Sequence, residues 1–227
     1  MSNGARYPAL DILRGMTICF MIIVNTAGDY EHTFAPLLHA HWHGFTPTDL
    51  VFPSFLFVVG NAISFVQLKW QSLPASQVVL KILKRTALIF LLGYLMYWFP
   101  FIQESASGWS LKPIQETRVL GVLQRIALCY GIASLLIYFL QTRWVIAITL
   151  FLLVIYRFLL SHFGDLTLEG NAVLALDRWL MGDSHLYHGE GVAFDPEGWL
   201  STLPAIGNVV IGYLAGVYIQ SKGKTYE

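Results

Sequence analysis

Six runs of about 20 mostly apolar residues occupy more than half of this chain. Runs of that length are typical of helices that cross a membrane, because a helix satisfies its own backbone hydrogen bonds where water is absent. The runs lie approximately at Leu10 to Ala27, Leu50 to Leu68, Ile82 to Phe101, Val119 to Leu140, Trp144 to Phe163 and Trp199 to Ile219. We therefore predict an all-α, polytopic transmembrane helix bundle with about six spans, in which residues 1–227 form a single domain.

The composition agrees with a membrane location. Of the 227 residues, 56% are hydrophobic and only 12% are charged, and the mean hydropathy of +0.58 exceeds that of an ordinary soluble domain. The formal net charge is +0, so there is no field of one sign to recruit nucleic acid, and we expect none as a partner. Cys19 and Cys129 lie within apolar runs, where a thiol behaves as a small hydrophobe, so we predict neither a disulfide nor a zinc site.

The basic residues are sorted between two sets of loops, and lysine and arginine mark the cytoplasmic side of membrane proteins. One set holds Arg6, Lys69, Lys81, Lys84, Arg85, Arg143, Lys222 and Lys224, and the opposite set holds Lys112, Arg118 and Arg178. We therefore predict a cytoplasmic N-terminus, with segments 28–48, 102–118 and 164–198 on the other side. The polar first ten residues, with no small-residue cleavage site after them, argue against a removed signal peptide.

The densest group of chemically capable side chains lies just before the second apolar run. His39, His41 and His43 fall within five residues, and Asp49 follows at the edge of the run. Histidine takes up and releases a proton near neutral pH, so an imidazole suits a general base or a transient nucleophile. Asp49 is able to orient one imidazole, and Asn25, late in the first run, is able to donate or accept a hydrogen bond beside it. We predict that base, orienting carboxylate and amide meet at one mouth.

Two other interpretations of the histidines stay open at this point. Alternating histidines share one face of an extended strand, and Glu31 or His32 would then complete a zinc shell. Trp42 and Pro47 disturb such a strand. The other interpretation is hydrogen bonding at the membrane interface without chemistry.

Charged side chains inside the apolar runs are costly to bury, so each one is a candidate functional residue. Arg14 and Asp11 are i, i+3 neighbours on one helical face and are able to form an ion pair, with Arg14 reaching back to the interface. Arg125, beside Gln124, needs an acceptor, and a ligand or a neighbouring helix meets that need equally well. Lysines and arginines between 69 and 85 either mark the inner side or meet phosphates of a cytoplasmic ligand.

Several of these segments, taken together, resemble the heparan-α-glucosaminide N-acetyltransferase family and its bacterial relatives over nearly the whole chain. The segments are Arg14-Gly15, Asn25, His39-Ala-x-Trp42-x-Gly44-Phe-Thr46-x-x-Asp49-Leu-Val-Phe-Pro53-x-Phe55, Gly60, Gly121-Val-Leu-Gln124-Arg125 and Asp195-Pro196-Glu197-Gly198. The run from His39 to Phe55 is the most specific, since several residue types recur at fixed spacing. His41 and His43 depart from the family pattern.

The resemblance implies an acyltransferase that moves an acetyl group from cytoplasmic acetyl-CoA to an amino sugar or related glycan across the membrane, without a metal. It implies that His39, Asn25 and Asp49 are catalytic residues and that Arg125, Gln124 and Arg14 bind the acetyl-CoA. The short N-terminus implies a bacterial inner (cytoplasmic) membrane and lipid contact. The resemblance also implies that further spans follow, about ten or eleven in all, so that this chain is the N-terminal portion and can be inactive in isolation.

The residues alone also suit a transporter with a His-, Asp- and Arg-lined path for a solute or proton. A third alternative is a non-catalytic scaffold within a larger assembly. Acceptor identity and oligomeric state, a homo-oligomer included, are not determined by the sequence.

Overall fold

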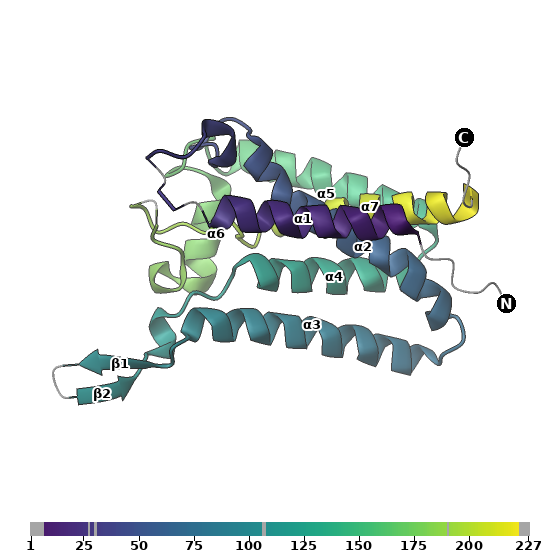
Figure 1. The fold of residues 1–227 in the computed structure, drawn as a ribbon, viewed down its shortest axis with the longest axis horizontal. Coiled ribbons are helices and arrows are strands. Elements are labelled where there is room, and N and C mark those ends of the chain that lie inside the picture. The colour runs from purple at the N-terminus through teal and green to yellow at the C-terminus, as the bar shows by residue number, and fades with distance from the viewer. Residues whose placement is uncertain (1–6, 27, 30, 106–107, 190, 223–227) are drawn as a thin grey trace. The chain divides into compact units, whose positions relative to one another are not determined.

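The apolar runs fold as helices in a computed structural model of the chain (Figure 1). It describes residues 7–26, 28–29, 31–105, 108–189 and 191–222. Arg6, Ala27 and Lys224, which entered the sequence predictions, lie outside the described residues. The helices are α1 (Pro8–Asn25), α2 (Val51–Trp70), α3 (Ala75–Trp98), α4 (Val122–Phe139), α5 (Thr142–His162), α6 (Ala172–Met181) and α7 (Thr202–Lys222). The prediction of an all-α membrane fold is confirmed.

Five helical segments among the described residues are long and apolar enough to cross a membrane. They are α1, α2 with the 3₁₀ turn η2 (Pro47–Leu50) before it, α4, α5 and α7. The remaining predicted span, Ile82 to Phe101, falls in α3, which meets the length but not the apolar composition. Lys81, Lys84 and Arg85 lie in the first half of that helix, and Pro100 and Phe101 lie beyond its end.

The contacts divide the chain into two compact units, and the single domain over residues 1–227 stays a prediction. Unit 1 comprises 1–72 and 208–227, and unit 2 comprises 73–207. The helix α7 contributes its first residues to unit 2 and the rest to unit 1.

Glycines allow α2 and the unit 1 part of α7 to approach closely. A Cβ atom at Gly60 would lie 1.8 Å from the Val209 carbonyl oxygen, and one at Gly212 would lie 1.9 Å from the Phe57 carbonyl oxygen. Gly216 follows Gly212 by four residues, the spacing that brings two helix backbones together in membranes. No larger residue fits at these contacts without moving a helix.

Unit 2 is built on α4, half of which is buried, and α3 packs along it. Two elements escaped the sequence prediction. A hairpin of β1 (Ile102–Ser105) and β2 (Gly108–Leu111) extends past the end of α3, with Ile102 opposite Leu111 (Figure 1). The short helix α6 interrupts the loop that follows α5, and its N-cap Asn171 accepts from the Leu174 N–H group.

We expect Gly212→Ala to destabilise the protein by about 1–3 kcal/mol, because the added Cβ meets backbone that cannot yield. Gly15→Ala is the matched control, since Gly15 also lies in a helix and has nothing within 4 Å of its Cβ position. Thermal unfolding in one detergent measures both variants. A Gly212→Ala protein that melts at or above the wild-type temperature contradicts the close packing of α2 on α7.

Candidate functional site

The segment that precedes α2 is folded by a helix cap. Thr46 is extended and Pro47 occupies the first position of η2, where its missing N–H group costs nothing. The Asp49 carboxylate, three residues after Thr46, accepts a hydrogen bond from the Thr46 N–H group at 2.8 Å, as the acidic residue of a capping box does. The cap therefore brings the Asp49 side chain back toward the loop that carries the histidines.

One imidazole of the three contacts this carboxylate. His39 Nδ1 lies 2.7 Å from Asp49 Oδ1, while Asp49 Oδ2 accepts from the N–H groups of Thr46, at 2.8 Å, and Ala40, at 3.4 Å. An ionised carboxylate only accepts hydrogen bonds, so in the neutral ring His39 Nδ1 carries the hydrogen and Nε2 keeps its lone pair. Because the His39 side chain is 71% exposed, that lone pair is accessible to a reactant.

A second histidine–carboxylate pair lies in the same loop. His32 Nδ1 is 2.5 Å from Asp29 Oδ2, and the two side chains are 83% and 57% exposed. The hydrogen bond from His32 holds the pKa of the Asp29 carboxyl below its ordinary value. This pair joins residues three apart, whereas the His39–Asp49 pair joins residues ten apart.

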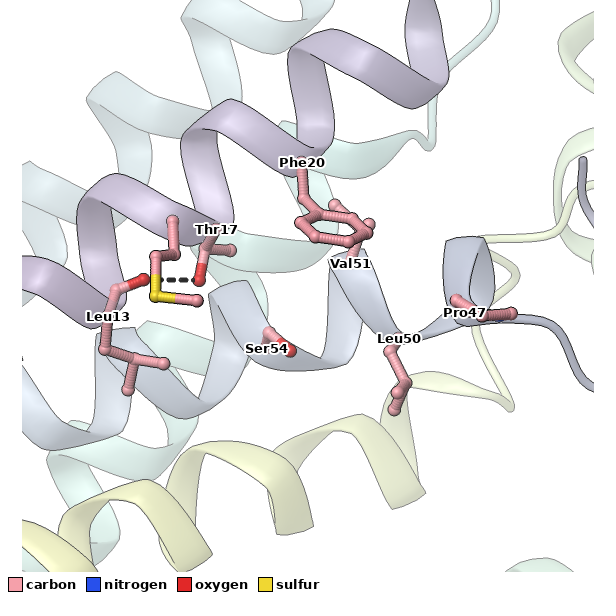
Figure 2. Close-up of a pocket in the computed structure, with 8 residues that line it drawn as sticks. Leu13, Thr17, Phe20, Pro47, Leu50, Val51 and Ser54 are labelled. Atoms are coloured by element: carbon pink, nitrogen blue, oxygen red, sulfur yellow. Dashed lines mark hydrogen bonds between the residues drawn. The ribbon is translucent and has the colours of Figure 1, made fainter. Parts of the chain in front are cut away.

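A groove of ≈ 220 Å³ begins beside the capped turn and runs between α1 and α2. Figure 2 shows Pro47 and Leu50 of η2 at one end and Leu13 of α1 at the other. Its lining is mostly apolar, and the Thr17 hydroxyl, which lies along it, donates to the Leu13 carbonyl oxygen (Figure 2). Because Pro47 and Leu50 flank Asp49 in sequence, an apolar chain in this groove would end near the histidine pair.

A second hollow of ≈ 360 Å³ lies between α1 and α2 near Tyr7, and Arg14 and Asp11 line it. Arg14 Nη1 lies 3.6 Å from Asp11 Oδ1, with both side chains about two-fifths exposed. The ion pair that the spacing predicted is present. An exposed pair of this kind contributes little stability. The Arg14 guanidinium is accessible from the hollow, because Arg14 lines it and is partly exposed.

The other predicted residues of unit 1 lie differently. The Asn25 amide donates to the Met21 carbonyl oxygen one turn earlier in α1, at 2.9 Å, and not to His39 or Asp49. His41 and His43 are exposed. Among the described residues, no three His, Cys, Asp or Glu side chains come close enough to hold a metal ion.

In unit 2, Arg125 is buried and donates to backbone. Its Nη2 lies 2.9 Å from the Gly198 carbonyl oxygen and 3.3 Å from that of Pro196, and it also contacts the Ser201 hydroxyl. These contacts tie α4 to the segment 195–201. The adjacent Gln124 is fully buried, and its side-chain amide has no hydrogen-bond partner in the part of the chain that the structure describes.

Sequence reasoning missed a cluster of charges around Arg118, which it had counted only as a loop cation. Arg118 Nη2 lies 2.6 Å from Asp195 Oδ1 and 2.5 Å from Glu197 Oε2, and its Nε lies 3.0 Å from Asp195 Oδ2. Burial raises the pKa of Glu197, and the neighbouring Asp195 adds to that rise. Tyr97 and Tyr187 cover the guanidinium, each ring centroid 5.0 Å away. The Asp195-Pro-Glu197-Gly motif was the available signal.

Asp177 of α6 is a buried carboxyl beside this cluster. Its Oδ1 accepts from the Trp199 N–H group at 2.9 Å, and its Oδ2 has no hydrogen-bond partner among the described residues. Burial raises the pKa of Asp177 to about 6. A Cβ atom at Gly198 would lie 2.0 Å from Oδ2, which explains the glycine that follows Glu197.

These features define a multi-span membrane protein with an accessible, carboxylate-held histidine and an apolar groove lined by Pro47 and Leu50, which flank the carboxylate residue in sequence. Residues 6–226 match the family model described as heparan-alpha-glucosaminide N-acetyltransferase, catalytic. The chain belongs to this family, and the resemblance predicted from its sequence motifs is confirmed.

Two relatives bear the name heparan-alpha-glucosaminide N-acetyltransferase. The mouse protein is 27% identical and the human protein 26% identical, each over 98% of this chain. The chain covers 41% of the mouse protein and 40% of the human protein. It therefore spans about two-fifths of the length of these relatives.

We expect the protein to lose stability relative to Asp177→Asn as the pH rises from 4 to 7. The Asp177 pKa is about 6 in the folded protein against an ordinary 3.8. The extra stability is therefore complete below pH 3.8 and is lost as the pH passes 6. Between these pH values the free energy of unfolding of the wild type should fall by about 1–3 kcal/mol relative to that of Asp177→Asn. The difference between the two melting temperatures measures this change. Asp165→Asn is the control. Because the Asp165 pKa is lowered, the protein should gain stability relative to Asp165→Asn as the pH rises.

Proposed function

We propose that this chain carries the acetyl-transfer site of a membrane acetyltransferase, with acetyl-CoA as donor and an amino sugar or related glycan as acceptor. The observation that carries the proposal is the His39–Asp49 pair, 2.7 Å apart, with the second imidazole nitrogen accessible. Membership of the family supports acetyl transfer. The relatives' names support the amino sugar acceptor.

In the proposed reaction His39 acts as the general base for the acceptor amine. The Nε2 lone pair removes a proton from the acceptor amine as its nitrogen attacks the thioester carbonyl. A carbon–nitrogen bond forms, the carbon–sulfur bond breaks, and CoA leaves as a thiolate that takes the proton back from the imidazolium. Asp49 stabilises the imidazolium and holds the tautomer that keeps Nε2 free. Proton transfer of this kind contributes about 10²- to 10⁴-fold.

A covalent variant uses the same geometry. Nε2 attacks the thioester, CoA departs as a thiolate, and the acetyl group rests on the imidazole until the acceptor amine attacks it. The carbon–Nε2 bond then breaks, Nε2 takes the proton that the amine loses, and the imidazolium returns this proton to the thiolate. Asp49 serves both variants, because each places positive charge on the ring. The acceptor then needs to reach only the exposed His39 and not the CoA.

The groove between α1 and α2 supports a path for the donor. Its apolar lining suits the acyl end of the thioester arm, and Pro47 and Leu50 lie at the end that adjoins Asp49. Arg14 lines the hollow at the other end of the helix pair, where its guanidinium would meet a CoA phosphate. In this proposal Asn25, at the end of α1, polarises the reacting carbonyl once its amide leaves Met21.

Arg125 and Gln124 remain proposed CoA contacts on the strength of the resemblance. The unpartnered amide of Gln124 supports such a role, since a buried amide without a hydrogen bond is costly. The carbonyl contacts of Arg125 support a second role, in which it braces the segment 195–201.

We further propose that the N-terminus is cytoplasmic and that His39 faces the opposite side. The lysines and arginines of the 69–85 segment support this orientation. A bacterial inner membrane is the proposed location. Donor and acceptor would then lie on opposite sides, so the reaction moves an acetyl group and not the whole CoA across the membrane.

We expect His39→Ala to lower kcat for acetyl transfer by about 10²- to 10⁴-fold, because the base is removed. The assay follows acetyl-CoA consumption by purified protein in lipid vesicles with glucosamine as acceptor. His32→Ala is the matched control: it also breaks an exposed histidine–carboxylate pair in the same loop, and it should keep wild-type kcat. Equal rates for His39→Ala and wild type would sink the proposed function.

Asp49→Asn should lower kcat by about 10²-fold or more while His39 remains in place. The asparagine amide donates to Nδ1, which places the hydrogen on Nε2 and removes the lone pair that the reaction needs. Asp29→Asn makes the same change beside His32 and should leave kcat unchanged. Comparable kcat values for Asp49→Asn and Asp29→Asn would show that Asp49 does not orient His39.

A further inference from the structure

We propose that Thr46 is a positioning residue for His39, acting through a hydroxyl that holds the His39 backbone and an N–H group that holds Asp49. This inference rests on the proposed function, because it concerns the same histidine. It assigns a role to a side chain that touches neither imidazole nor reactant.

The Thr46 hydroxyl reaches outside the turn that it caps. Its Oγ1 lies 2.7 Å from the Leu38 carbonyl oxygen, eight residues earlier in the chain, and 3.1 Å from Asp49 Oδ2. One hydroxyl hydrogen serves one acceptor at a time, and Leu38 offers the shorter contact. The hydroxyl hydrogen is therefore donated outside the turn, while the hydroxyl oxygen stays an acceptor in the capping box of η2.

The contact between the Thr46 hydroxyl and Leu38 matters because of where Leu38 lies in the chain. Leu38 immediately precedes His39, so the hydroxyl fixes the backbone from which the imidazole extends. The Thr46 N–H group meanwhile donates to Asp49 Oδ2, which directs Oδ1 toward His39 Nδ1. Thr46 thus contacts the base segment with one group and the orienting carboxylate with the other.

The burial pattern agrees with a clamp rather than a surface turn. Thr46 and Asp49 are partly buried whereas His39 is exposed. The neighbouring Thr48 is 2% exposed and its hydroxyl donates to the Pro36 carbonyl oxygen. Two threonine hydroxyls therefore hold the 36–38 segment against η2. Only the Thr46 hydroxyl acts next to His39 and beside Asp49.

The test compares Thr46→Val, which keeps the shape and loses the hydroxyl, with Thr46→Ser, which keeps the hydroxyl. We expect Thr46→Val to lower kcat by about 5- to 100-fold, with KM for acetyl-CoA unchanged within about twofold. Thr46→Ser should restore kcat to within about threefold of wild type. Thr33→Val is the matched control, because the Thr33 hydroxyl also donates to a backbone carbonyl, that of Asp29.

A second measurement needs no acetyl transfer. Diethyl pyrocarbonate acylates an unprotonated imidazole nitrogen, and peptide mass spectrometry follows the labelling of His39 and His32 separately. Thr46→Val should slow His39 labelling by about threefold or more and leave His32 unchanged. If Thr46→Val does not fold, as judged by its melting temperature, Thr46→Ala takes its place.

The outcomes separate the two claims. Wild-type kcat and wild-type His39 labelling in Thr46→Val overturn the assignment, and so does a Thr46→Ser protein as slow as Thr46→Val. If His39→Ala is inactive in the same experiment, the proposed function stands even when the Thr46 assignment is overturned. If His39→Ala is fully active, the proposed function falls, and the labelling of His39 alone decides whether Thr46 positions it.

Discussion

The Asp49 carboxylate is the group on which the candidate site depends, because each of its oxygens has a different task. Oδ2 accepts the N–H groups of Thr46 and Ala40, which folds the loop onto η2, and Oδ1 contacts the His39 imidazole. The same carboxylate therefore starts the helix turn that leads into α2 and selects the nitrogen of His39 that stays available. The hydrogen bonds that fold the loop onto η2 therefore also orient the base.

Burial imposes the second constraint, which is that an arginine taken out of water needs partners within the protein. Arg125 satisfies it with the carbonyl oxygens of Pro196 and Gly198, and Arg118 satisfies it with two carboxylates and two tyrosine rings. Both arginines bind the segment that contains the Asp195-Pro-Glu197-Gly motif. That segment, though a loop, is thereby held by two arginine side chains.

Sequence reasoning anticipated the helices and the histidine pair because both depend on local signals. Apolar runs predict spans, and a base needs a carboxylate partner, which the spacing of His39 and Asp49 allowed. The family resemblance was required to select His39 from three imidazoles. The predicted span Ile82 to Phe101 is the exception. Its last turns are apolar, but Lys81, Lys84 and Arg85 lie in the same helix and make that helix as a whole less apolar.

What the sequence did not disclose depends on contacts between distant residues. The Arg118 cluster joins residues 77 and 79 positions apart, and nothing near Arg118 indicates its partners. The hydroxyl contact from Thr46 to Leu38 requires a fold of the loop that no periodicity predicts. Asn25 was expected beside His39, yet its amide is taken up by the helix carbonyl one turn before it, as short polar side chains at helix ends often are.

The central claim is that Asp49 holds His39 with a hydrogen on Nδ1 and a lone pair on Nε2. Nitrogen NMR of the protein with ¹⁵N-labelled histidine, in lipid nanodiscs at a pH where the ring is neutral, reports this tautomer directly, and His39→Gln identifies the signal. The account predicts a protonated Nδ1 and an unprotonated Nε2 in the wild type, reversed in Asp49→Asn. A wild-type His39 that carries its hydrogen on Nε2 would contradict it.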